Sequence, residues 1–492
     1  MIKKLLLGIM AIFASMHVSA QYATPNTGIE WDLNDIMANA PTGVLTFSNG
    51  IYTLSQNLTI SAGDQLSINE DTTLHVDPNV QITVAGTLIA DAEETIITAT
   101  NPAAPYDSMR FEAGSTVYLE NVTINYGKGI RVSTGNFEMH NSSMSFHAGG
   151  TITSAALTFS TGNPIVNNSS FISNVVPAFS SGANQEVAAT FTANYLENNN
   201  TSNTNRPQIN MGPSGNDTIR IINNIIKGNP ANTLVGGIAV SSLLGNTNRV
   251  IIDVNVIYDN RYGITVAGGN SGGYIRGNII EDNDTQNLPN SGGSGISLSA
   301  ATAGMNIIAS GNEIRRNLWG ITLINQANID LGSDNPADNS PGGNIFANNG
   351  NGGNTYALFN NTPLAVSAIN NCWIEGAEST AADVENVINH QNDDPALGAV
   401  DYLPFINCGA LATANHTVAK PVVFPNPNSG QFTVELLEEG VAEFLNLNGQ
   451  LLHKQNLNVG ANDLDLNFPM GLYLMRTETA SGTFVTKILN HY

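Results

Sequence analysis

Apolar and polar residues alternate in short runs along most of this chain, and each run ends at Asn, Gly or Asp. Between residues 194 and 349 one pattern repeats: Asn, any residue, a bulky apolar residue, two further residues and a second Asn. The copies are Asn194-Leu196-Asn199, Asn224-Ile226-Asn229, Asn255-Ile257-Asn260, Asn278-Ile280-Asn283, Asn312-Ile314-Asn317 and Asn344-Phe346-Asn349. Alternation with period two indicates short strands separated by turns. A unit this short must bury its apolar residues against copies of itself, so the pattern predicts stacked coils of a parallel β-helix.

The repeated Asn residues have a physical role in such a coil. An Asn side chain tolerates left-handed backbone in a sharp turn and forms hydrogen bonds with nearby main chain. In stacked coils the same amides would lie above one another. We therefore expect an amide ladder that satisfies polar groups buried at the turns.

These residues resemble the right-handed parallel β-helix repeats of the pectin-lyase-like superfamily. The resemblance implies an all-β fold, with a β-helix over residues 46–408. Residues 21–45 are expected to form an N-terminal cap, because Trp31, Leu33, Ile36 and Met37 suggest a brief amphipathic helix before Pro41. About 13 coils would fit into this length.

The first 20 residues have the features of a secretory signal peptide. Lys3 and Lys4 precede an apolar run from Leu5 to Ala14, and Val18-Ser19-Ala20 provides small residues for cleavage. The run is too short to span a bilayer. We expect residues 1–20 to be removed, and no later segment is apolar enough for transmembrane anchoring.

The pattern changes after a linker over residues 409–419. Residues 420–492 read as a small antiparallel β-sandwich, with a hairpin turn at Asn448-Gly449 and another turn at Ser481-Gly482. The segment contains Phe424-Pro425-Asn426-Pro427, a Gly471-Leu472-Tyr473 strand and a last strand that contains Lys487. It resembles the C-terminal sorting domain of the type IX (Por) secretion system. The resemblance implies a Bacteroidetes-type exported protein, the secretion machinery as a partner, and removal of this domain on release or surface attachment.

The charge balance narrows the choice of partners. The sequence has 17 Lys and Arg against 40 Asp and Glu, a formal net charge of −23. An acidic surface repels nucleic acid and anionic membranes, so we expect neither as a partner. We expect a secreted or cell-surface protein that is a monomer. Its two cysteines, Cys372 and Cys408, are free to pair in an exported chain and would close the end of the β-helix.

Candidate chemistry follows from the repeat, because equivalent positions of successive coils form one outward column. If the register holds, Asp259, Asp282, Glu281 and Arg316 share a face, and these are the candidate catalytic residues. Carboxylates one coil apart can act as acid and base on a glycosidic bond, and an Arg can take a proton in a lyase. Candidate sugar-binding residues nearby are Tyr258, Arg261, Tyr262 and Trp319.

A separate loop offers a candidate calcium site. Asp330, Asp334 and Asp338 lie in a segment rich in Pro and Gly, and carboxylate oxygens are the ligands that Ca²⁺ prefers. Their spacing is not that of an EF-hand. A set of turns that use Asp and Asn side chains explains the same residues without a metal.

Two classes of function remain open from the sequence. The first is a binding or structural rod that holds polysaccharide or a surface partner along its side. The second is a polysaccharide lyase or glycoside hydrolase that uses the Asp259 column. The Asn-Thr-Asp, Gly-His-Gly and Arg-x-Lys motifs of polygalacturonase-like enzymes are absent from the chain, which favours the first class.

Overall fold

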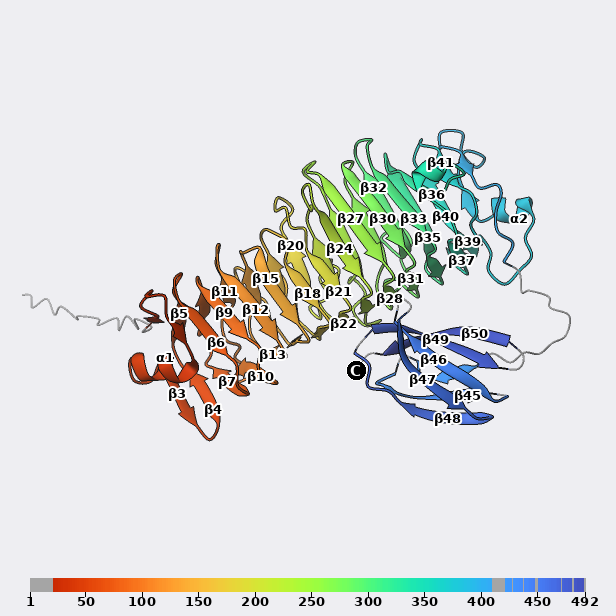
Figure 1. Ribbon diagram of the computed structural model, residues 1–492. Coiled ribbons are helices and arrows are strands. Elements are labelled where there is room, and N and C mark those ends of the chain that lie inside the picture. The colour runs from red at the N-terminus through yellow and green to blue at the C-terminus, as the bar shows by residue number, and fades with distance from the viewer. Residues whose placement is uncertain are drawn as a thin grey trace, which may run out of the picture.

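The computed structural model describes residues 21–408 and 421–490, except 427, 437, 447–449, 470, 480 and 481. The predicted signal peptide (1–20), the predicted linker (409–419) and the Asn448-Gly449 turn lie outside the described residues. So does Ser481 of the Ser481-Gly482 turn. Within the described part, the long domain is a parallel β-helix and the C-terminal domain is an antiparallel sandwich (Figure 1).

Three long sheets form the sides of the β-helix, and every coil except the last two adds a strand to each sheet in the order A, B, C. Sheet A contains β1 (Gln21–Ala23), β5 (Asn57–Ile60), β8 (Ile82–Val84), β11 (Met109–Phe111), β14 (Ile130–Val132), β17 (Leu157–Phe159), β20 (Phe179–Ser181), β23 (Ile209–Met211), β26 (Ile238–Ser241), β29 (Ile264–Ala267), β32 (Ser294–Ala300), β35 (Trp319–Asn325), β40 (Leu358–Asn361) and β42 (Ile388–Asn389). Sheet B contains β2 (Glu30–Trp31), β6 (Gln65–Ile68), β9 (Thr87–Ala90), β12 (Thr116–Glu120), β15 (Asn136–His140), β18 (Ile165–Asn167), β21 (Thr190–Thr192), β24 (Thr218–Ile222), β27 (Asn248–Asp253), β30 (Ser271–Arg276), β33 (Asn306–Ser310), β36 (Ile329–Gly332), β41 (Val366–Ala368) and β43 (Val400–Asp401).

Sheet C contains β3 (Leu45–Ser48), β4 (Ile51–Leu54), β7 (Thr72–Val76), β10 (Thr95–Ala99), β13 (Val122–Asn125), β16 (Ser143–Ser145), β19 (Ser170–Ile172), β22 (Tyr195–Glu197), β25 (Ile225–Lys227), β28 (Val256–Tyr258), β31 (Ile279–Glu281), β34 (Glu313–Arg315) and β37 (Ile345–Ala347). Neighbouring strands in all three sheets are parallel, except that β3 and β4 form an antiparallel hairpin at the start. A short hairpin of β38 (Gly350–Asn351) and β39 (Asn354–Thr355) projects from a late coil. The predicted all-β parallel solenoid is confirmed.

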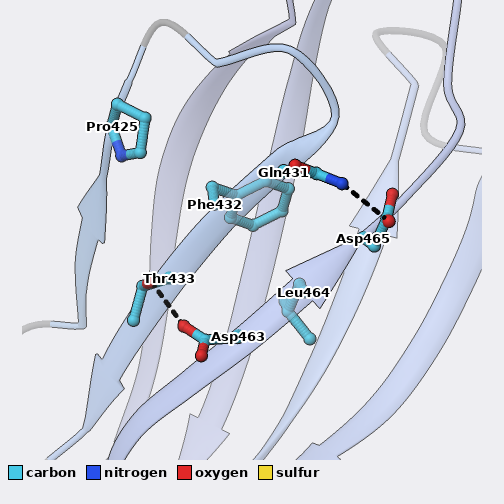
Figure 2. A pocket seen from close by; sticks show the side chains of 7 residues that line it. All are labelled: Pro425, Gln431, Phe432, Thr433, Asp463, Leu464 and Asp465. Atoms are coloured by element: carbon cyan, nitrogen blue, oxygen red, sulfur yellow. Dashed lines mark hydrogen bonds between the residues drawn. The ribbon is translucent and has the colours of Figure 1, made fainter.

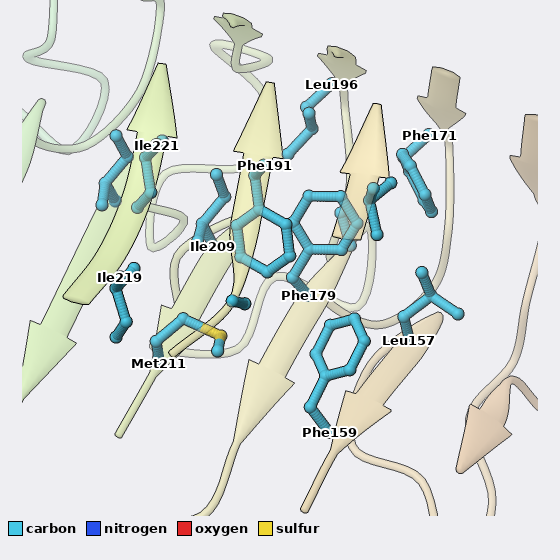
Figure 3. Close-up of a cluster of buried hydrophobic side chains, with 14 of the residues drawn as sticks. Leu157, Phe159, Phe171, Phe179, Phe191, Leu196, Ile209, Met211, Ile219 and Ile221 are labelled. Atoms are coloured by element: carbon cyan, nitrogen blue, oxygen red, sulfur yellow. The ribbon is translucent and has the colours of Figure 1, made fainter. Parts of the chain in front are cut away.

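The core is a continuous stack of inward-pointing side chains. Figure 3 shows its aromatic middle, where Phe179 lies 4.5 Å from Phe171 and 4.2 Å from Phe191 between ring centroids. Each strand contributes its alternate residues to this stack, as the period-two pattern requires. Coils without the Asn signature are therefore held by the same apolar stacking as those with it.

The predicted amide ladder is present at the turn between sheets B and C. The side-chain Nδ2 of each first Asn donates to Oδ1 of the next coil's Asn at 2.8–3.0 Å, from Asn194 through Asn224, Asn255, Asn278, Asn312 and Asn344 to Asn371. The same Oδ1 atoms also accept backbone N–H groups. Each buried amide is thus satisfied by the coils above and below it.

A second ladder lies at the turn between sheets C and A, and the prediction that Asn229 belongs to it is wrong. Asn229 does not join it: Asn199 donates to Gln208 Oε1 at 3.0 Å, and Gln208 Nε2 donates to Asn260 Oδ1 at 3.0 Å. Asn229 instead donates to the side chain of Asn198. The preceding Gly228 lacks the positive φ that the equivalent residues of later coils adopt, so this turn follows a different path.

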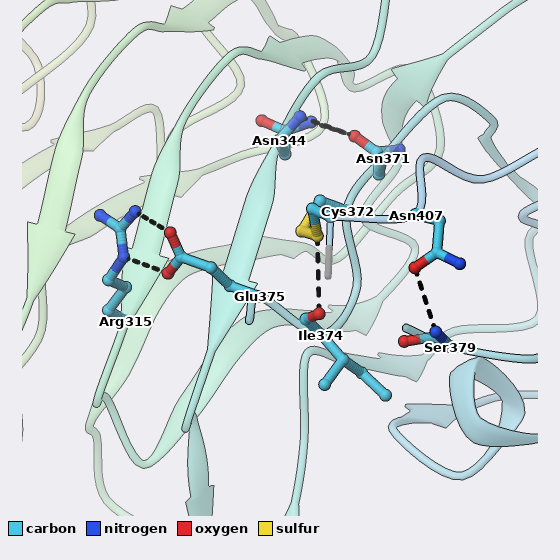
Figure 4. The surroundings of a disulfide bond; sticks show 9 residues. Arg315, Asn344, Asn371, Cys372, Ile374, Glu375, Ser379 and Asn407 are labelled. Atoms are coloured by element: carbon cyan, nitrogen blue, oxygen red, sulfur yellow. Dashed lines mark hydrogen bonds and ion pairs between the residues drawn. A yellow bond between two sulfur atoms is a disulfide. The ribbon is translucent and has the colours of Figure 1, made fainter. Parts of the chain in front are cut away.

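Both ends of the β-helix have extra elements. The predicted N-terminal helix is α1 (Leu33–Asn39), which starts at a capping box between Asp32 and Asp35 and buries Leu33 and Ile36. Of the other two residues expected in it, Trp31 lies in β2 instead and Met37 is exposed. At the other end lie the short 3₁₀ helix η1 (Pro336–Asp338) and α2 (Ala381–Glu385). Cys372 and Cys408 form a disulfide with Cα atoms 5.8 Å apart, beside the last rungs of the ladder (Figure 4).

The C-terminal domain packs two antiparallel sheets face to face. One contains β44 (Val422–Phe424), β45 (Gln431–Leu436) and β48 (Gly460–Asp465). The other contains β47 (Leu451–Leu457), β46 (Gly440–Leu445), β49 (Gly471–Thr479) and β50 (Gly482–Asn490). Phe432, Phe444, Tyr473 and Met475 lie in its core. The predicted small sandwich is confirmed.

We expect Asn255→Ala to destabilise the β-helix by roughly 3 kcal/mol, because it leaves buried partners in Asn224, Ile221 and Asn278 without a hydrogen bond. Urea unfolding followed by circular dichroism measures the effect. Asn229→Ala is the matched control and should cost less than about 1 kcal/mol, because Asn229 is half-buried and outside the ladder. Equal losses in the two variants would contradict a special role of the ladder.

Candidate functional site

The predicted column of charged residues is in register. Tyr258 pairs with Glu281 across β28 and β31, and Glu281 pairs with Arg315 across β31 and β34. Each of these residues is the last of its three-residue strand. Their side chains point outward from sheet C, because the middle residue of each strand faces the core. The next residue of each coil is Asp259, Asp282 or Arg316, in the turn toward sheet A.

This turn position is first of all a backbone requirement. Asp259, Asp282 and Arg316 all have positive φ, at 58°, 56° and 53°. Left-handed backbone suits Asn and Asp better than other residues that have a Cβ. The occurrence of Asp at two of these positions is therefore explained by the turn alone, and a catalytic role needs further support.

Arg316 joins two of the candidate carboxylates. Its guanidinium donates to both oxygens of Asp282 at 2.8 and 2.7 Å, and to Glu281 at 2.9 Å. The side chains of Arg316 and Asp282 are 45% and 42% exposed. An ion pair this open to water contributes about 0.2–1 kcal/mol. This one cation pairs with both Asp282 and Glu281, so one of their two negative charges remains uncompensated by it.

Asp259 differs from its neighbours electrostatically. Partial burial and the nearby Asp282 carboxylate raise its pKa, although Lys227 acts in the opposite direction. The pKa of Asp284 is raised by the same two kinds of cause, burial first and then Asp282. Asp259 and Asp284 thus both lie close enough to Asp282 for its negative charge to raise their pKa values.

Arg261 and Tyr262, two candidate sugar-binding residues, have structural roles. Arg261 is 8% exposed, and its guanidinium donates to Asn205 Oδ1 and to the carbonyl of Ser291, which ties two loops together. The Tyr262 ring covers Gly236, where a Cβ would lie 2.1 Å from the ring. Burial raises the pKa of Tyr262 to about 12.

Trp319, another candidate, lies on a different face and forms the wall of a groove. It begins β35 in sheet A, and its ring contacts Tyr356 and Phe359, each 4.7 Å away between centroids. Its indole N–H donates to the carbonyl of Pro289 at 3.0 Å, which fixes the ring. The groove has a volume of about 470 Å³. It is lined by Pro289, Asn290, Ser291, Gly292, Ser294, Ser297, Trp319, Thr322, Ile324, Phe359 and Asn361, none of which is charged.

A second groove on sheet A was not predicted from the sequence. It measures about 650 Å³ and is lined by hydroxyl groups together with Arg131 and Arg206. Neither guanidinium forms an ion pair with a carboxylate of the described residues. Arg131 donates to the carbonyl of Ile152 at 3.2 Å, and its buried Nε has no partner. The only signal in the sequence is the alternation of Ile130, Arg131 and Val132, which places an Arg on an outward position.

The predicted calcium site is not assembled. Among the described residues, no three His, Cys, Asp or Glu side chains are grouped closely enough to hold a metal. Asp330 accepts hydrogen bonds from Ser340 and Gly332, and Asp338 accepts them from Ser333 and Asn335. Asp330, Asp334 and Asp338 therefore lie in a loop held by turns, the alternative that the sequence left open.

A further hollow of about 370 Å³ lies on the C-terminal sandwich, against β45 and β48 (Figure 2). Its two carboxylates are already occupied, because Asp463 accepts from Thr433 at 2.7 Å and Asp465 accepts from Gln431 at 3.0 Å. These are cross-strand contacts that stabilise the sheet. The hollow contains none of the predicted site residues.

Comparisons with known proteins give one family match and one similar structure. Residues 422–490 match the family of secretion system C-terminal sorting domains. Among solved structures, a mutant of the periplasmic alginate epimerase AlgG is similar, with 11% identity and a TM-score of 0.41 over 77% of this chain and 84% of that chain. A comparison with curated protein sequences finds no match.

The fold and the matched segment define a class of protein: a parallel β-helix followed by a sorting domain of the type IX (Por) secretion system. The sorting domain indicates export by that system, to the outside of the cell or its surface. In the part of the chain that the structure describes, no helix has the length and apolar character needed to cross a membrane.

We expect Asp259→Asn to stabilise the protein slightly at neutral pH, by about 0.5 kcal/mol. A raised pKa means that the folded state binds more protons than the unfolded state between the ordinary value of 3.8 and the raised value. Stability therefore falls as pH rises through that window. The uncharged Asn side chain avoids this loss of stability. The stability advantage of the variant over the wild type should therefore shrink below pH 3.8.

Thermal unfolding at neutral and acidic pH measures this difference. Asp282→Asn is the control with the opposite sign, because it removes the partner of Arg316 and should lower stability at neutral pH. A pH-independent effect of Asp259→Asn would show that turn preference, and not charge, explains it.

Proposed function

We propose that this protein is an exported polysaccharide-binding rod, whose ligand lies along the outward face of sheet A. The observation that carries the proposal is an outward column of polar residues that connects the two grooves. In register order the column reads Arg131, Thr158, Ser180, Asn210, Ala239, Thr265, Ser297, Thr322 and Phe359. Hydroxyl and amide groups predominate in it. Those of Asn210, Thr265 and Ser297 are partly exposed and can form hydrogen bonds with sugar hydroxyls, whereas Thr158, Ser180 and Thr322 are buried.

The geometry suits a linear chain. Eight strand-to-strand steps separate β14, which carries Arg131, from β40, which carries Phe359. At roughly 4.8 Å per step the two ends of the track are on the order of 40 Å apart. A track of this length, with a polar residue at every step from Arg131 to Thr322 except Ala239, matches an extended polymer better than a single small molecule.

The two ends of the track differ in chemistry. At one end Trp319 and Phe359 offer aromatic faces, with no charge in the groove. Flat rings of this kind provide large apolar contact area at low conformational cost. At the other end Arg131 and Arg206 offer guanidinium groups that have no carboxylate partner among the described residues, which suits a carboxylate or sulfate substituent of a ligand. The ligand class that fits both ends is a polysaccharide with some acidic residues.

A second candidate function is turnover of the polysaccharide. The raised pKa of Asp259 beside Asp282 favours it, because a carboxyl group that retains its proton can act as a general acid. Binding is the better-supported function, because Arg316 already engages Asp282 and neither carboxylate lines a sheet A groove.

We expect Trp319→Ala to weaken binding of an extended neutral glycan by about tenfold, ~1.4 kcal/mol, through loss of the aromatic wall. Calorimetry or glycan-array binding with the secreted protein measures the affinity. Phe47→Ala is the matched control, because Phe47 is an exposed aromatic residue in the hairpin of β3 and β4, far along the chain from the groove. Undiminished binding by Trp319→Ala would place the ligand elsewhere.

We expect the double variant Arg131→Gln and Arg206→Gln to lose about tenfold in affinity for a polyuronate or sulfated glycan, ~1.4 kcal/mol. Binding of a neutral glycan should be unchanged. The affinity for the acidic glycan should also fall with added salt in the wild type. Arg220→Gln is the control, since Arg220 lies on sheet B and is paired with Asp217.

The same incubations can report turnover, because release of reducing ends or unsaturated products is measured alongside binding. Products that disappear in Asp259→Asn would establish an enzyme and place its site at the turn. Binding without products at any pH would support the rod.

A further inference from the structure

Two leucines of the sorting domain point away from that domain's own hydrophobic core. Leu472 on β49 pairs with Leu489 on β50. Their neighbours Tyr473 and Ile488 point into the core of the sandwich. Because side chains alternate along a strand, Leu472 and Leu489 point out of the sandwich. Each is nevertheless only 7% exposed.

The β-helix covers these leucines. Leu472 and Leu489 form one buried cluster with Tyr195, Ile225 and Val256 of sheet C. Ile279, next in register after Val256, packs at its edge. Figure 1 shows the sandwich beside the coils that contain β22, β28 and β31.

Tyr195, Ile225, Val256 and Ile279 form what we call the sheet C strip. They occupy the first position of successive strands, and each is in register with the next. This position points outward, since the middle residue of each strand faces the core. The strip would expose a row of apolar side chains without a cover, which marks it as an interaction surface.

A charged contact marks the end of the strip. Glu313 is the residue in register after Ile279, and its carboxylate lies 2.6 Å from the ammonium group of Lys487. Lys487 is two residues before Leu489 on β50, so both side chains point out of the same face. Burial alone would raise the pKa of Glu313, but hydrogen bonds from Lys487 and Arg315 lower it overall. The leucines of the sorting domain thus lie against the apolar strip of sheet C, and its lysine lies against the glutamate at the end of that strip.

The contact also reaches a candidate site residue. Tyr258 packs at the edge of the cluster, and a cavity of about 180 Å³ remains between Tyr258, Glu281 and Lys487. Burial is the largest cause of the raised pKa of Tyr258, followed by the charge of Asp259.

We propose that the sheet C strip is a docking surface for the sorting domain of the same chain, which shields the strip for as long as the two domains remain joined. Docking uses β50, the strand whose lysine is part of the pattern by which the sorting domain resembles its family. That face of the sorting domain is then occupied by the cargo. The domain must leave sheet C before another protein can contact Leu489 and Lys487.

Hydroxyl-radical labelling of the full chain, purified with its sorting domain still attached and read by mass spectrometry, tests the proposal. Tyr195 should be protected in the wild type and labelled several-fold more in Leu489→Asp, whose carboxylate would face the strip. Val485→Asp is the matched control: Val485 lies on the same face of the same strand but is 62% exposed, so Tyr195 should remain protected. Strong labelling of Tyr195 in the wild type, or equal labelling in all three proteins, would overturn the proposal.

Exchange of the charges of Glu313 and Lys487 is a control for variants that are merely misfolded. Glu313→Lys and Lys487→Glu should each increase labelling of Tyr195, and the two together should restore protection. Failure of the double variant to restore protection, in a chain that folds normally by circular dichroism, counts against the contact. Protection that falls on dilution would assign the cover to a second copy of the chain and reject docking within one chain.

Discussion

The asparagine ladder is the contact on which the register of the coils from Asn194 to Asn371 depends. At each turn between sheets B and C the chain bends from one sheet into the next within the stack, so backbone polar groups are buried there and have no water to bond with. An Asn side chain provides both a donor and an acceptor at the right height, and the next coil must place its own Asn directly above. Asn255, for example, accepts from the backbone and side chain of Asn224 and donates to Asn278. A coil displaced by one residue would lose all of these bonds, so the ladder fixes which residues of successive coils share a column.

Fixed columns give the sides of the rod different chemistry. The outward column of sheet A is polar and runs between an uncharged aromatic groove and an arginine groove. Sheet C carries the apolar strip and, two positions later in each strand, a charged column in which Lys227 pairs with Glu197. Because one position of the repeat sets one column, small changes at that position alter a whole side of the molecule while the core stays the same.

The sequence predicted what depends on local periodicity and did not predict what depends on loops or on a second domain. The Asn positions predicted the coils, the ladder and the register of Tyr258 with Glu281, because the repeat itself encodes them. Gln208 could not be predicted as the substitute for Asn229, since it reaches the ladder from outside the repeat. Arg261 is an outward charge by pattern, yet two loops of variable length enclose it. The docking of Leu489 could not be predicted either. It depends on which alternate side chains point outward on β50 and on the strands of sheet C, and these strands belong to separate domains.

Ligand binding and docking use different sheets, and this separation helps to distinguish the two proposed functions. The track on sheet A has none of its lining residues in the contact with the sorting domain. A rod that binds along sheet A would therefore bind equally well with the sorting domain docked or removed. Tyr258 and Glu281, in contrast, lie at the edge of the docked domain, next to the turn that carries Asp259. An enzyme that used this turn would change its activity when the sorting domain leaves, so dependence on docking is itself a signature of where the chemistry takes place.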